Sequence, residues 1–323
     1  MQKSLIIGGG GMVGQKLARL LASDPLDSDD EVILFDMAFP PEGGAPAAQR
    51  IPGNVNDQGA FRRLVAGRPD NIFYLVAIVS GEAETNFDLG WQVNMTAFRD
   101  FLEILRAEVE ASKGSYHPKV IFTSSIAVFG APFPDKIDDE FLCAPRTSYG
   151  AQKAMSELLL TDFIRKGFFD GLSIRLPTIC VRPGKANLAA SSFFSGIIRE
   201  PLNGQEAVLP VPRDVRHWHA SPKSAAGFLR HAATLDQAAI GPRPALNVPG
   251  VSCTVDEQIE ALRDIAGADT VKLIKEAPDE AIMAIVKNWP RDFAPDRAKA
   301  LGFTAETEFS EIIETYISED LKR

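Results

Sequence analysis

A run of four glycines near the beginning of the chain constrains its fold more than any other feature. The run follows a short apolar segment, leads into a helical pattern and carries the spacing Gly8-x-x-Gly11-x-x-Gly14. Gly8 allows a tight turn, Gly11 allows backbone N–H groups to approach a pyrophosphate, and Gly14 allows the helix to lie close to the strand. The sequence therefore predicts a strand–turn–helix unit that binds a dinucleotide, with a flexible glycine-rich turn as the alternative.

A carboxylate closes the second apolar segment, at about the distance where such units contact the adenosine ribose. Asp36 ends the run Val32-Ile33-Leu34-Phe35-Asp36. We expect its oxygens to accept hydrogen bonds from the ribose hydroxyls, and its charge would repel a 2′-phosphate. NAD is therefore the expected cofactor in preference to NADP. The alternative is that Asp36 is a solvated residue at a strand end.

Apolar segments of strand length alternate with helical patterns through the first half of the chain. The expected strands cover residues 4–7, 31–35, 72–79, 119–123 and 172–176. A first helix is expected to end at Asp24-Pro25, and a longer helical segment covers residues 87–109. This alternation predicts an α/β fold, a Rossmann-type doubly wound parallel sheet with helices on both faces.

The character of the sequence changes after Arg175. Prolines at positions 177, 183, 201, 210 and 212 divide the chain into short pieces, and helical patterns return at residues 223–234, 256–265 and 310–321. We expect an NAD-binding domain of residues 1–176, together with about 214–248. A smaller α/β C-terminal substrate lobe is expected to comprise residues 177–213 and 249–323.

Charge and cysteine content argue against several classes of function. The formal net charge is −9, so the chain offers no basic field for nucleic acid or for an anionic membrane. Cys143, Cys180 and Cys253 are far apart and match neither a disulfide framework nor a zinc cluster. No apolar segment is long enough for a secretory signal or a membrane span. We expect a cytoplasmic protein without metal, nucleic-acid or membrane partners.

A tyrosine and a lysine lie four residues apart where a helical pattern begins. The run Tyr149-Gly150-Ala151-Gln152-Lys153 places the phenol and the ammonium one turn apart on one helix face. A free phenol titrates near 10, and lowering that pKa by about three units needs about 4 kcal/mol. A lysine and a nicotinamide cation together can supply this stabilisation. The spacing therefore indicates an acid–base pair.

Two serines follow the expected strand at residues 119–123. Ser124 and Ser125 then lie at the carboxyl end of this strand, where open α/β sheets bind ligands. We expect the Ser125 hydroxyl to orient the substrate. Ser124 is expected to cap a helix or to form a turn.

Together these motifs resemble the extended short-chain dehydrogenases, the NAD-dependent epimerase/dehydratase family, over nearly the whole chain. The resemblance implies catalytic roles for Ser125, Tyr149 and Lys153. It also implies that Asn94 supports the lysine and an active-site water. The implied cofactor contacts are Gly8, Gly11, Met12, Val13, Gly14, Asp36, Asn54, Val55, Leu75, Ala77, Tyr149, Lys153, Pro177 and Thr178. Asn54 departs from the family, which usually has an aspartate near the adenine, and Ile7 replaces its usual threonine.

A narrower resemblance within the family covers residues 78–81, 175–184 and 190–204. It implies oxidation of the C2 hydroxyl of a four-carbon sugar acid to the 2-oxo acid by hydride transfer, with Tyr149 as base. The carboxylate of such an acid needs a cation, and Arg182 and Arg216 are the two candidates. Either arginine could instead be an ordinary surface residue. The hydroxyls of the sugar acid are expected to meet Ser80, Ser125, Asn187 and Ser192, whereas His217 and His219 are expected to be loop or packing residues.

Two other functions stay open at this point. A nucleotide-sugar epimerase or dehydratase uses the same serine, tyrosine and lysine. A catalytically silent dinucleotide-binding protein is less in keeping with the sequence, because such proteins commonly lose the tyrosine or the lysine. The resemblance also implies a homodimer, and the helix after Tyr149 has more apolar breadth than one buried face requires.

Overall fold

A parallel sheet forms the centre of the molecule. The structure, a computed structural model, describes residues 2–40, 45, 48–184 and 190–321. Seven strands pair in the order β10-β6-β5-β4-β1-β2-β3, and all neighbouring pairs are parallel. The order changes direction between β1 and β4, so the expected doubly wound α/β fold is confirmed. The strands are β1 (Lys3–Ile7), β2 (Glu31–Asp36), β3 (Gln49–Pro52), β4 (Asn71–Tyr74), β5 (Lys119–Ser125), β6 (Asp170–Leu176) and β10 (Ala245–Asn247).

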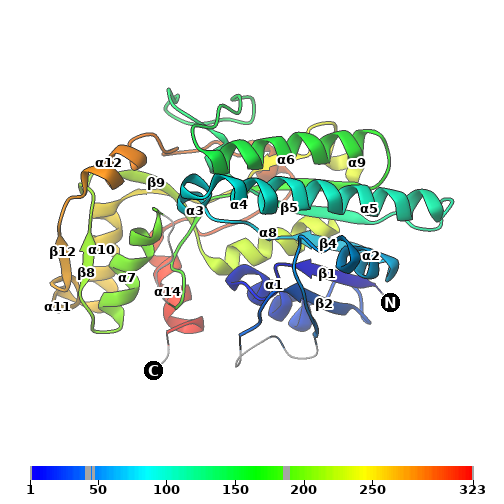
Figure 1. Cartoon of the computed structure of the whole chain (residues 1–323). Coiled ribbons are helices and arrows are strands. Elements are labelled where there is room, and N and C mark those ends of the chain that lie inside the picture. The colour runs from blue at the N-terminus through cyan, green and yellow to red at the C-terminus, as the bar shows by residue number, and fades with distance from the viewer. Residues whose placement is uncertain (1, 41–44, 46–47, 185–189, 322–323) are drawn as a thin grey trace.

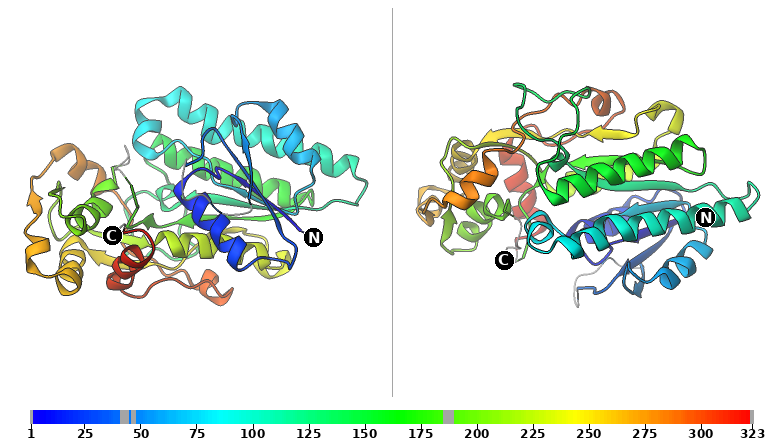
Figure 2. Two further views of the ribbon diagram at one scale, coloured as in Figure 1. Left: turned by 90° about the horizontal axis from the view of Figure 1, so that it is seen from below. Right: turned by 45° about the horizontal axis from the view of Figure 1, so that its top comes forward.

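Helices cover both faces of the sheet, because side chains alternate across its strands and both sets are apolar. One face is covered by α2 (Gln58–Ala66), α5 (Ala97–Ala111) and α6 (Ser148–Arg165), and its core is rich in phenylalanine. The other face is covered by α1 (Met12–Ser23) and α8 (Pro222–Thr234). Figure 1 shows α5 and α6 side by side on the outside of the sheet. The view from below in Figure 2 brings α1 to the front.

The chain leaves the sheet after Tyr74, earlier than the expected strand over residues 72–79. Residues 75–79 lead to the short helix α3 (Ser80–Thr85). The side chain of Asn94 takes the place of a neighbouring strand here, because its Oδ1 accepts from the Ile78 N–H at 2.8 Å and its Nδ2 donates to the Ile78 carbonyl at 3.1 Å. An apolar run does not reveal such a partner, which is why the predicted strand was too long.

The expected helical segment over residues 87–109 consists of three consecutive pieces. These are α4 (Phe87–Trp91), a π-helical turn (Gln92–Thr96) and α5. The π-helical turn carries Asn94, which is 2% exposed. The turn therefore positions one of the predicted site residues.

The second half of the chain builds a smaller lobe beside the sheet (Figure 1). Its three-stranded sheet joins β7 (Thr178–Ile179) and β11 (Val251–Thr254) to the central β9 (Arg216–Ala220). A separate pair is formed by β8 (Ala207–Leu209) and β12 (Ile274–Glu276). The helices are α7 (Ser192–Leu202), α10 (Val255–Ala266), α11 (Ala268–Val271), α12 (Glu280–Val286) and α14 (Phe309–Glu319). Their apolar faces form a core of their own around Phe194, Ile259 and Ile312.

The division of the chain into two lobes stays a prediction. Within residues 214–248, α8, α9 (Gln237–Ile240) and β10 accompany the parallel sheet, whereas β9 belongs to the sheet of the smaller lobe. The short helix α13 (Asp296–Ala300) and Phe303 pack in the same core as α1 and α8, although in sequence they lie between α12 and α14 of the smaller lobe. Within the described residues, no helix combines the length and the apolar content needed to cross a membrane.

Candidate active site at the carboxyl edge of the sheet

The glycine loop leaves almost no room for side chains. Gly8 has a φ of +95°, in the region that favours glycine. A Cβ on Gly10 would lie 1.9 Å from the carbonyl oxygen of Ala38, and one on Gly14 would lie 2.4 Å from the carbonyl oxygen of Gly8. The close approach of α1 to β1 therefore depends on Gly14. Gly10 is a further requirement that the spacing argument missed, although it belongs to the visible run of four glycines.

The N-terminus of α1 is suited to an anion. Gly11 is the N-cap residue, and among the described residues no side chain accepts a hydrogen bond from this end of the helix. The first turn, which includes Met12 and Val13, contains no acidic residue. Its backbone N–H groups and the positive end of the helix dipole therefore fit a pyrophosphate.

Asp36 lies beside this loop. Its Oδ2 accepts from the Gly10 N–H at 2.9 Å and its Oδ1 accepts from the Met37 N–H at 2.7 Å. These bonds hold the carboxylate at the carboxyl end of β2, next to the anion site at the start of α1. The two parts of the predicted dinucleotide motif thus lie together, as a bound NAD requires.

The other predicted adenine and nicotinamide contacts lie in segments that follow β3 and β4. Asn54 Oδ1 accepts from the Asn56 N–H at 2.9 Å, and the following Val55 is 7% exposed. Leu75 lies against Gly8, because a Cβ on Gly8 would be 3.2 Å from the Leu75 Cβ. Leu75 and the following Ala77 therefore run past the glycine loop. Their roles in cofactor binding stay predictions.

Tyr149 lies in the first turn of α6. The Thr147 side chain caps this helix by accepting from the Gly150 N–H at 3.1 Å. A Cβ on Gly150 would lie 2.2 Å from the carbonyl oxygen of Ala127, so the helix begins directly against the segment that follows β5. This contact places the first turn of α6, which carries Tyr149, next to the end of β5, which carries Ser125.

Lys153 lies one turn further along α6 and is 1% exposed. Its ammonium donates to the Thr123 carbonyl at 2.7 Å, and it lies 4.6 Å from the ring centroid of Phe122 and 5.7 Å from that of Tyr149. Burial lowers the Lys153 pKa to about 7, and the charge of Glu157 opposes this effect. The lysine thus meets Tyr149 at the end of β5, as the spacing predicted.

The phenol of Tyr149 is held neutral by the protein alone. Burial raises its pKa, while a hydrogen bond from Ser125 and the positive charge of Arg182 lower it. The largest effect is thus opposite to the lowering expected for a base, and the cation that acts on the phenol is Arg182. A positively charged nicotinamide was the second cation in that expectation, so the role of Tyr149 as base stays a prediction for the NAD-bound enzyme.

Ser124 and Ser125 are the last two residues of β5, and Ser125 rather than Ser124 makes the capping contact. Ser125 Oγ accepts from the Ala127 N–H at 3.1 Å and caps the 3-10 turn Ile126–Val128. The hydroxyl of Ser124 donates to the buried carboxylate of Glu157. The expectation that Ser124 is the capping serine was wrong, because neighbouring side chains point to opposite faces of a strand and Ser124 faces α6.

Asn94 lies next to α6, and none of its side-chain hydrogen bonds within the described residues is to the ammonium of Lys153. Besides its two bonds to Ile78, its Nδ2 donates to Gln152 Oε1 at 2.7 Å. Asn94 therefore holds the residue that precedes Lys153. Its implied support of the lysine would act through the position of α6.

The segment that contains Pro177 and Thr178 follows β6 directly. Thr178 Oγ1 lies 2.7 Å from His217 Nε2, and His217 Nδ1 lies 2.7 Å from the Pro290 carbonyl oxygen. Because a carbonyl can only accept, Nδ1 carries the proton and the threonine hydroxyl donates to Nε2. Burial lowers the His217 pKa to about 4, so the ring is a neutral support for Thr178.

His217 and His219 are packing residues, which is one of the two expected alternatives. Both lie in β9 and are 2% and 0% exposed. The ring of Phe194 stacks on His217 and meets the edge of His219, with centroids 5.2 and 4.7 Å apart. In the part of the chain that the structure describes, no three His, Cys, Asp or Glu side chains are grouped as a metal site would require.

Arg182 is held by hydrogen bonds within the smaller lobe. Its Nε donates to the Ile179 carbonyl at 2.9 Å and its Nη2 donates to the Ser191 hydroxyl at 3.0 Å. These contacts hold the guanidinium in the smaller lobe, close enough to Tyr149 for its charge to lower the phenol pKa. The arrangement places a cation beside the predicted base.

Arg216 has different surroundings. Its Nη1 donates to the Ser252 carbonyl at 3.0 Å, and its Nη2 lies 3.1 Å from the carboxylate of Glu257. Glu257 also forms the capping box of α10 with Thr254, so this arginine is engaged at the start of that helix. Of the two candidates, Arg182 is the one whose charge acts on the Tyr149 phenol.

The three remaining predicted substrate contacts are Ser80, Ser192 and Asn187. Ser80 is the first residue of α3, and Ser192 is the first residue of α7, next to the Ser191 that contacts Arg182. Asn187 lies outside the described residues. Contact between the two serines and a substrate stays a prediction.

Glu157 is the charged residue near the site that sequence reasoning missed. It is 4% exposed and forms an ion pair with Arg175 at 2.8 Å. The available signal was its spacing, because Glu157 follows Lys153 by four residues and must share its helix face.

The chain is similar to known proteins over its full length. It is 40% identical over 322 residues to D-erythronate dehydrogenase from Haemophilus influenzae, covering 99% of this chain and 100% of the relative. It is 41% identical to D-erythronate dehydrogenase from Cupriavidus necator, covering 98% of each chain. The crystal structure of the nucleoside-diphosphate-sugar epimerase from Agrobacterium tumefaciens superimposes with a TM-score of 0.93 at 50% identity, covering 99% of this chain and 94% of the other.

A family assignment follows from these similarities and from the geometry above. Residues 4–233 match the NAD dependent epimerase/dehydratase family. This match covers the glycine loop, Asp36, Ser125, Tyr149 and Lys153, and the two dehydrogenases extend the similarity to the rest of the chain. The chain belongs to the NAD dependent epimerase/dehydratase family.

Proposed function

We propose that the protein is an NAD-dependent dehydrogenase that oxidises the C2 hydroxyl of a four-carbon sugar acid of the D-erythronate type to the 2-oxo acid. Full-length similarity to two proteins named D-erythronate dehydrogenase supports this substrate class. The observation that carries the proposal is the meeting of Tyr149 and Lys153 at the end of β5, where the ammonium lies 5.7 Å from the centroid of the phenol ring. A small hydroxy acid also needs a cation beside the base that takes its proton, and we assign this role to Arg182, whose positive charge lowers the Tyr149 pKa.

The site residues divide the proposed reaction among them. Bound NAD supplies the hydride acceptor, held by the glycine loop and Asp36. Tyr149 takes the proton of the C2 hydroxyl, and Ser125 donates a hydrogen bond to the reacting oxygen. Lys153 holds the nicotinamide ribose and stabilises the phenolate, while Arg182 fixes the carboxylate so that C2 lies in a reactive position.

Reduction of NAD in the presence of candidate substrates tests this function. The purified protein is supplied with NAD and a panel of C3 to C6 aldonic acids, and NADH is followed by absorbance. We expect NADH with D-erythronate, with weaker activity on the shorter and longer acids. NADP is the matched control for the cofactor, and its use is expected to be poor because Asp36 repels a 2′-phosphate.

A nucleotide-sugar epimerase is the second candidate, favoured by the structural similarity to the nucleoside-diphosphate-sugar epimerase from Agrobacterium tumefaciens. An epimerase returns the hydride to its substrate, so it produces no net NADH. Conversion of a nucleotide sugar to its epimer without NADH, together with no reaction on any sugar acid, would replace the proposal by this one.

We also propose that the protein is a homodimer in the cytoplasm. The proposed dimer contact lies along α5 and α6, where Leu158 of α6 is 71% exposed. Cys143, Cys180 and Cys253 are free thiols in the described chain, which is in keeping with a reducing compartment. Sedimentation velocity of the purified protein tests the dimer, and fractionation of cells that produce it tests the compartment.

A further inference from the structure

Glu157 is a buried carboxylate one turn beyond Lys153 on α6. Burying a charged carboxylate to 4% exposure costs free energy unless the group is paired and hydrogen-bonded. The contacts of Glu157 therefore show what offsets this cost. The Ser124 hydroxyl donates to its Oε1 from β5. Arg175 on β6 donates to it through Nε, at 3.0 and 3.2 Å from its two oxygens, and through Nη2 at 2.8 Å.

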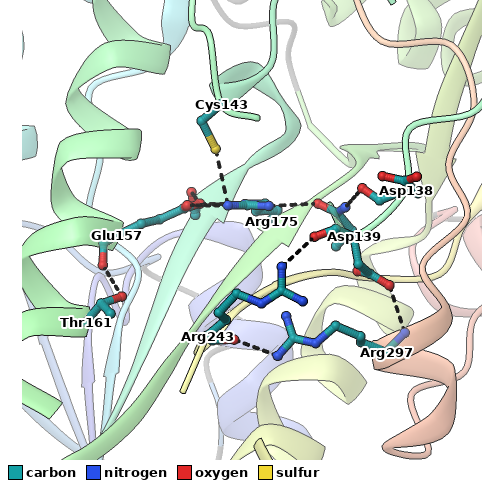
Figure 3. A network of polar contacts seen from close by, with 10 residues as sticks. Asp138, Asp139, Cys143, Glu157, Thr161, Arg175, Arg243 and Arg297 are labelled. Atoms are coloured by element: carbon teal, nitrogen blue, oxygen red, sulfur yellow. Dashed lines mark hydrogen bonds and ion pairs between the residues drawn. The ribbon is translucent and has the colours of Figure 1, made fainter. Parts of the chain in front are cut away.

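Arg175 is itself fixed from several sides, as Figure 3 shows. Its guanidinium lies 5.0 Å from the ring centroid of Phe129 and donates to Asn247 Oδ1 at 3.3 Å. It also donates to the sulfur of Cys143 at 3.2 Å, in the loop that precedes α6. Glu157 therefore has a rigid partner, and its negative charge stays at one place relative to Lys153.

We propose that Glu157 is a positioning residue whose negative charge keeps the buried Lys153 protonated and whose hydrogen bonds align the end of β5 with α6. The proposal rests on the function given above, because it assumes that Lys153 and Tyr149 form the acid–base pair. It assigns to Glu157 no contact with substrate or cofactor.

The surroundings of Lys153 explain why it needs such a charge. Among the described residues, the ammonium donates to the Thr123 carbonyl and lies near the rings of Phe122 and Tyr149, and these groups are neutral. Burial disfavours the charged form and lowers the Lys153 pKa, and the field of Glu157 is the effect that raises it. Without the carboxylate, the ammonium would lose its proton at a lower pH.

Other titratable groups around α6 do not replace Glu157. Tyr149 and Cys143 are neutral near pH 7, because burial raises the pKa of each. The positive charge of Arg175 is paired with Glu157, and the positive charge of Arg182 lowers the pKa of Tyr149. Glu84 of α3 accepts from the N–H of Ser148, which is the first residue of α6. The charged residues of α4 and α5 are exposed or partly exposed, namely Asp88, Arg99, Asp100, Glu103, Arg106, Glu108 and Glu110.

The test is the pH dependence of turnover in Glu157→Gln, which keeps an acceptor for Ser124 and removes the charge. In the NAD-bound wild type, where the nicotinamide cation also lowers the Tyr149 pKa, we expect Tyr149 to lose its proton beside the Lys153 ammonium as the pH rises. In the variant Lys153 gives up its proton more readily. The first proton lost as the pH rises then comes from Lys153, and it leaves a neutral amine beside a neutral phenol, which is inactive. We expect the ascending limb of kcat to move to lower pH by about one unit and the plateau to fall about tenfold. KM for NAD should change much less, because a neutral amine still donates to the ribose.

Two variants serve as controls. Glu157→Asp keeps the negative charge, so its ascending limb should stay at the wild-type pH even if the protein is less stable. Arg230→Gln removes a guanidinium that pairs with Asp24 at 2.6 Å, at the C-terminus of α1 and hence at the opposite edge of the sheet. It should leave both the limb and the plateau unchanged.

A purely structural role would lower the activity of Glu157→Gln by the same factor at every pH, and that result would overturn the proposal. If the single variant does not fold, Glu157→Gln with Arg175→Met removes the uncompensated guanidinium as well, and the same shift of the limb is required. Retained turnover in Tyr149→Phe would refute the proposed function. An unchanged pH profile in Glu157→Gln, where Tyr149→Phe is inactive, would refute this inference alone.

Discussion

At the scale of single residues, the hydroxyl of Tyr149 is the group on which the proposed reaction depends. Tyr149→Phe removes the oxygen that takes the proton and keeps the ring that packs near Lys153. We expect turnover to fall by at least about a thousandfold, with NAD affinity nearly unchanged. Initial rates and a fluorescence titration with NADH measure the two effects. Tyr116→Phe is the matched control. Tyr116 lies between α5 and β5, and its hydroxyl donates to the Pro69 carbonyl.

Arg182 belongs to the same scale, and its effect on pH dependence has a definite sign. Its positive charge lowers the Tyr149 pKa, so Arg182→Gln raises that pKa and should move the ascending limb of kcat to higher pH. This direction is opposite to that expected for Glu157→Gln. We also expect kcat/KM for the sugar acid to fall about a hundredfold or more, because the carboxylate loses a charged partner.

Arg182→Lys separates the two roles of this residue. It keeps the charge and loses the bidentate geometry, so KM for the sugar acid should rise while the limb stays near its wild-type pH. Arg216→Gln is the comparison for the carboxylate. A larger rise of KM in Arg216→Gln than in Arg182→Gln would transfer the carboxylate site to Arg216.

At the scale of elements, the approach of α1 to β1 depends on a missing side chain. A Cβ on Gly14 would lie 2.4 Å from the Gly8 carbonyl oxygen, and backbone on both sides leaves little room to adjust. Gly14→Ala should lower the free energy of unfolding by about 2–4 kcal/mol and weaken NAD binding, because α1 must move away from the loop. Urea unfolding and NADH titration measure these changes.

A second helical glycine provides the control for this element. Gly227 lies within α8, and a Cβ there would have no neighbour within 4 Å. Gly227→Ala should therefore leave NAD binding unchanged and raise the free energy of unfolding by up to about 1 kcal/mol, because alanine favours the helix. If Gly14→Ala and Gly227→Ala lost the same free energy of unfolding, a general effect of alanine in a helix, and not the contact with Gly8, would explain the result.

At the scale of the whole molecule, the proposed dimer depends on the outer surface of α5 and α6. Leu158 is 71% exposed in the single chain, although it lies in a long helix over the sheet. Leu158→Asp should convert a dimer to a monomer, because a carboxylate would be buried without a partner at the contact. Sedimentation velocity measures this change. Leu142→Asp, at a position 80% exposed in the loop before α6, should leave the dimer intact. A monomeric wild-type protein would contradict the proposal outright.

Much of the fold and the centre of the site could be read from local patterns. Periodicity placed the strands β1, β2, β5 and β6 within one or two residues of their observed bounds, because parallel strands buried on both faces are continuously apolar. The spacing from Tyr149 to Lys153 was enough to place both on one helix face. It was not enough for Ser124 and Ser125, whose roles depend on which face of the sheet α6 covers.

Local patterns in the sequence were enough for the dinucleotide-binding fold and for the shared helix face of Tyr149 and Lys153, because glycine spacing, strand polarity and helical periodicity act over a few residues. Tertiary structure alone decided which arginine lies beside Tyr149, where β4 ends, and which carboxylate faces the buried lysine. These contacts join residues far apart in the chain, such as Glu157 with Arg175 and Asn94 with Ile78. Their partners, and the burial that sets the charge of Lys153, exist only after the sheet and its helices have packed.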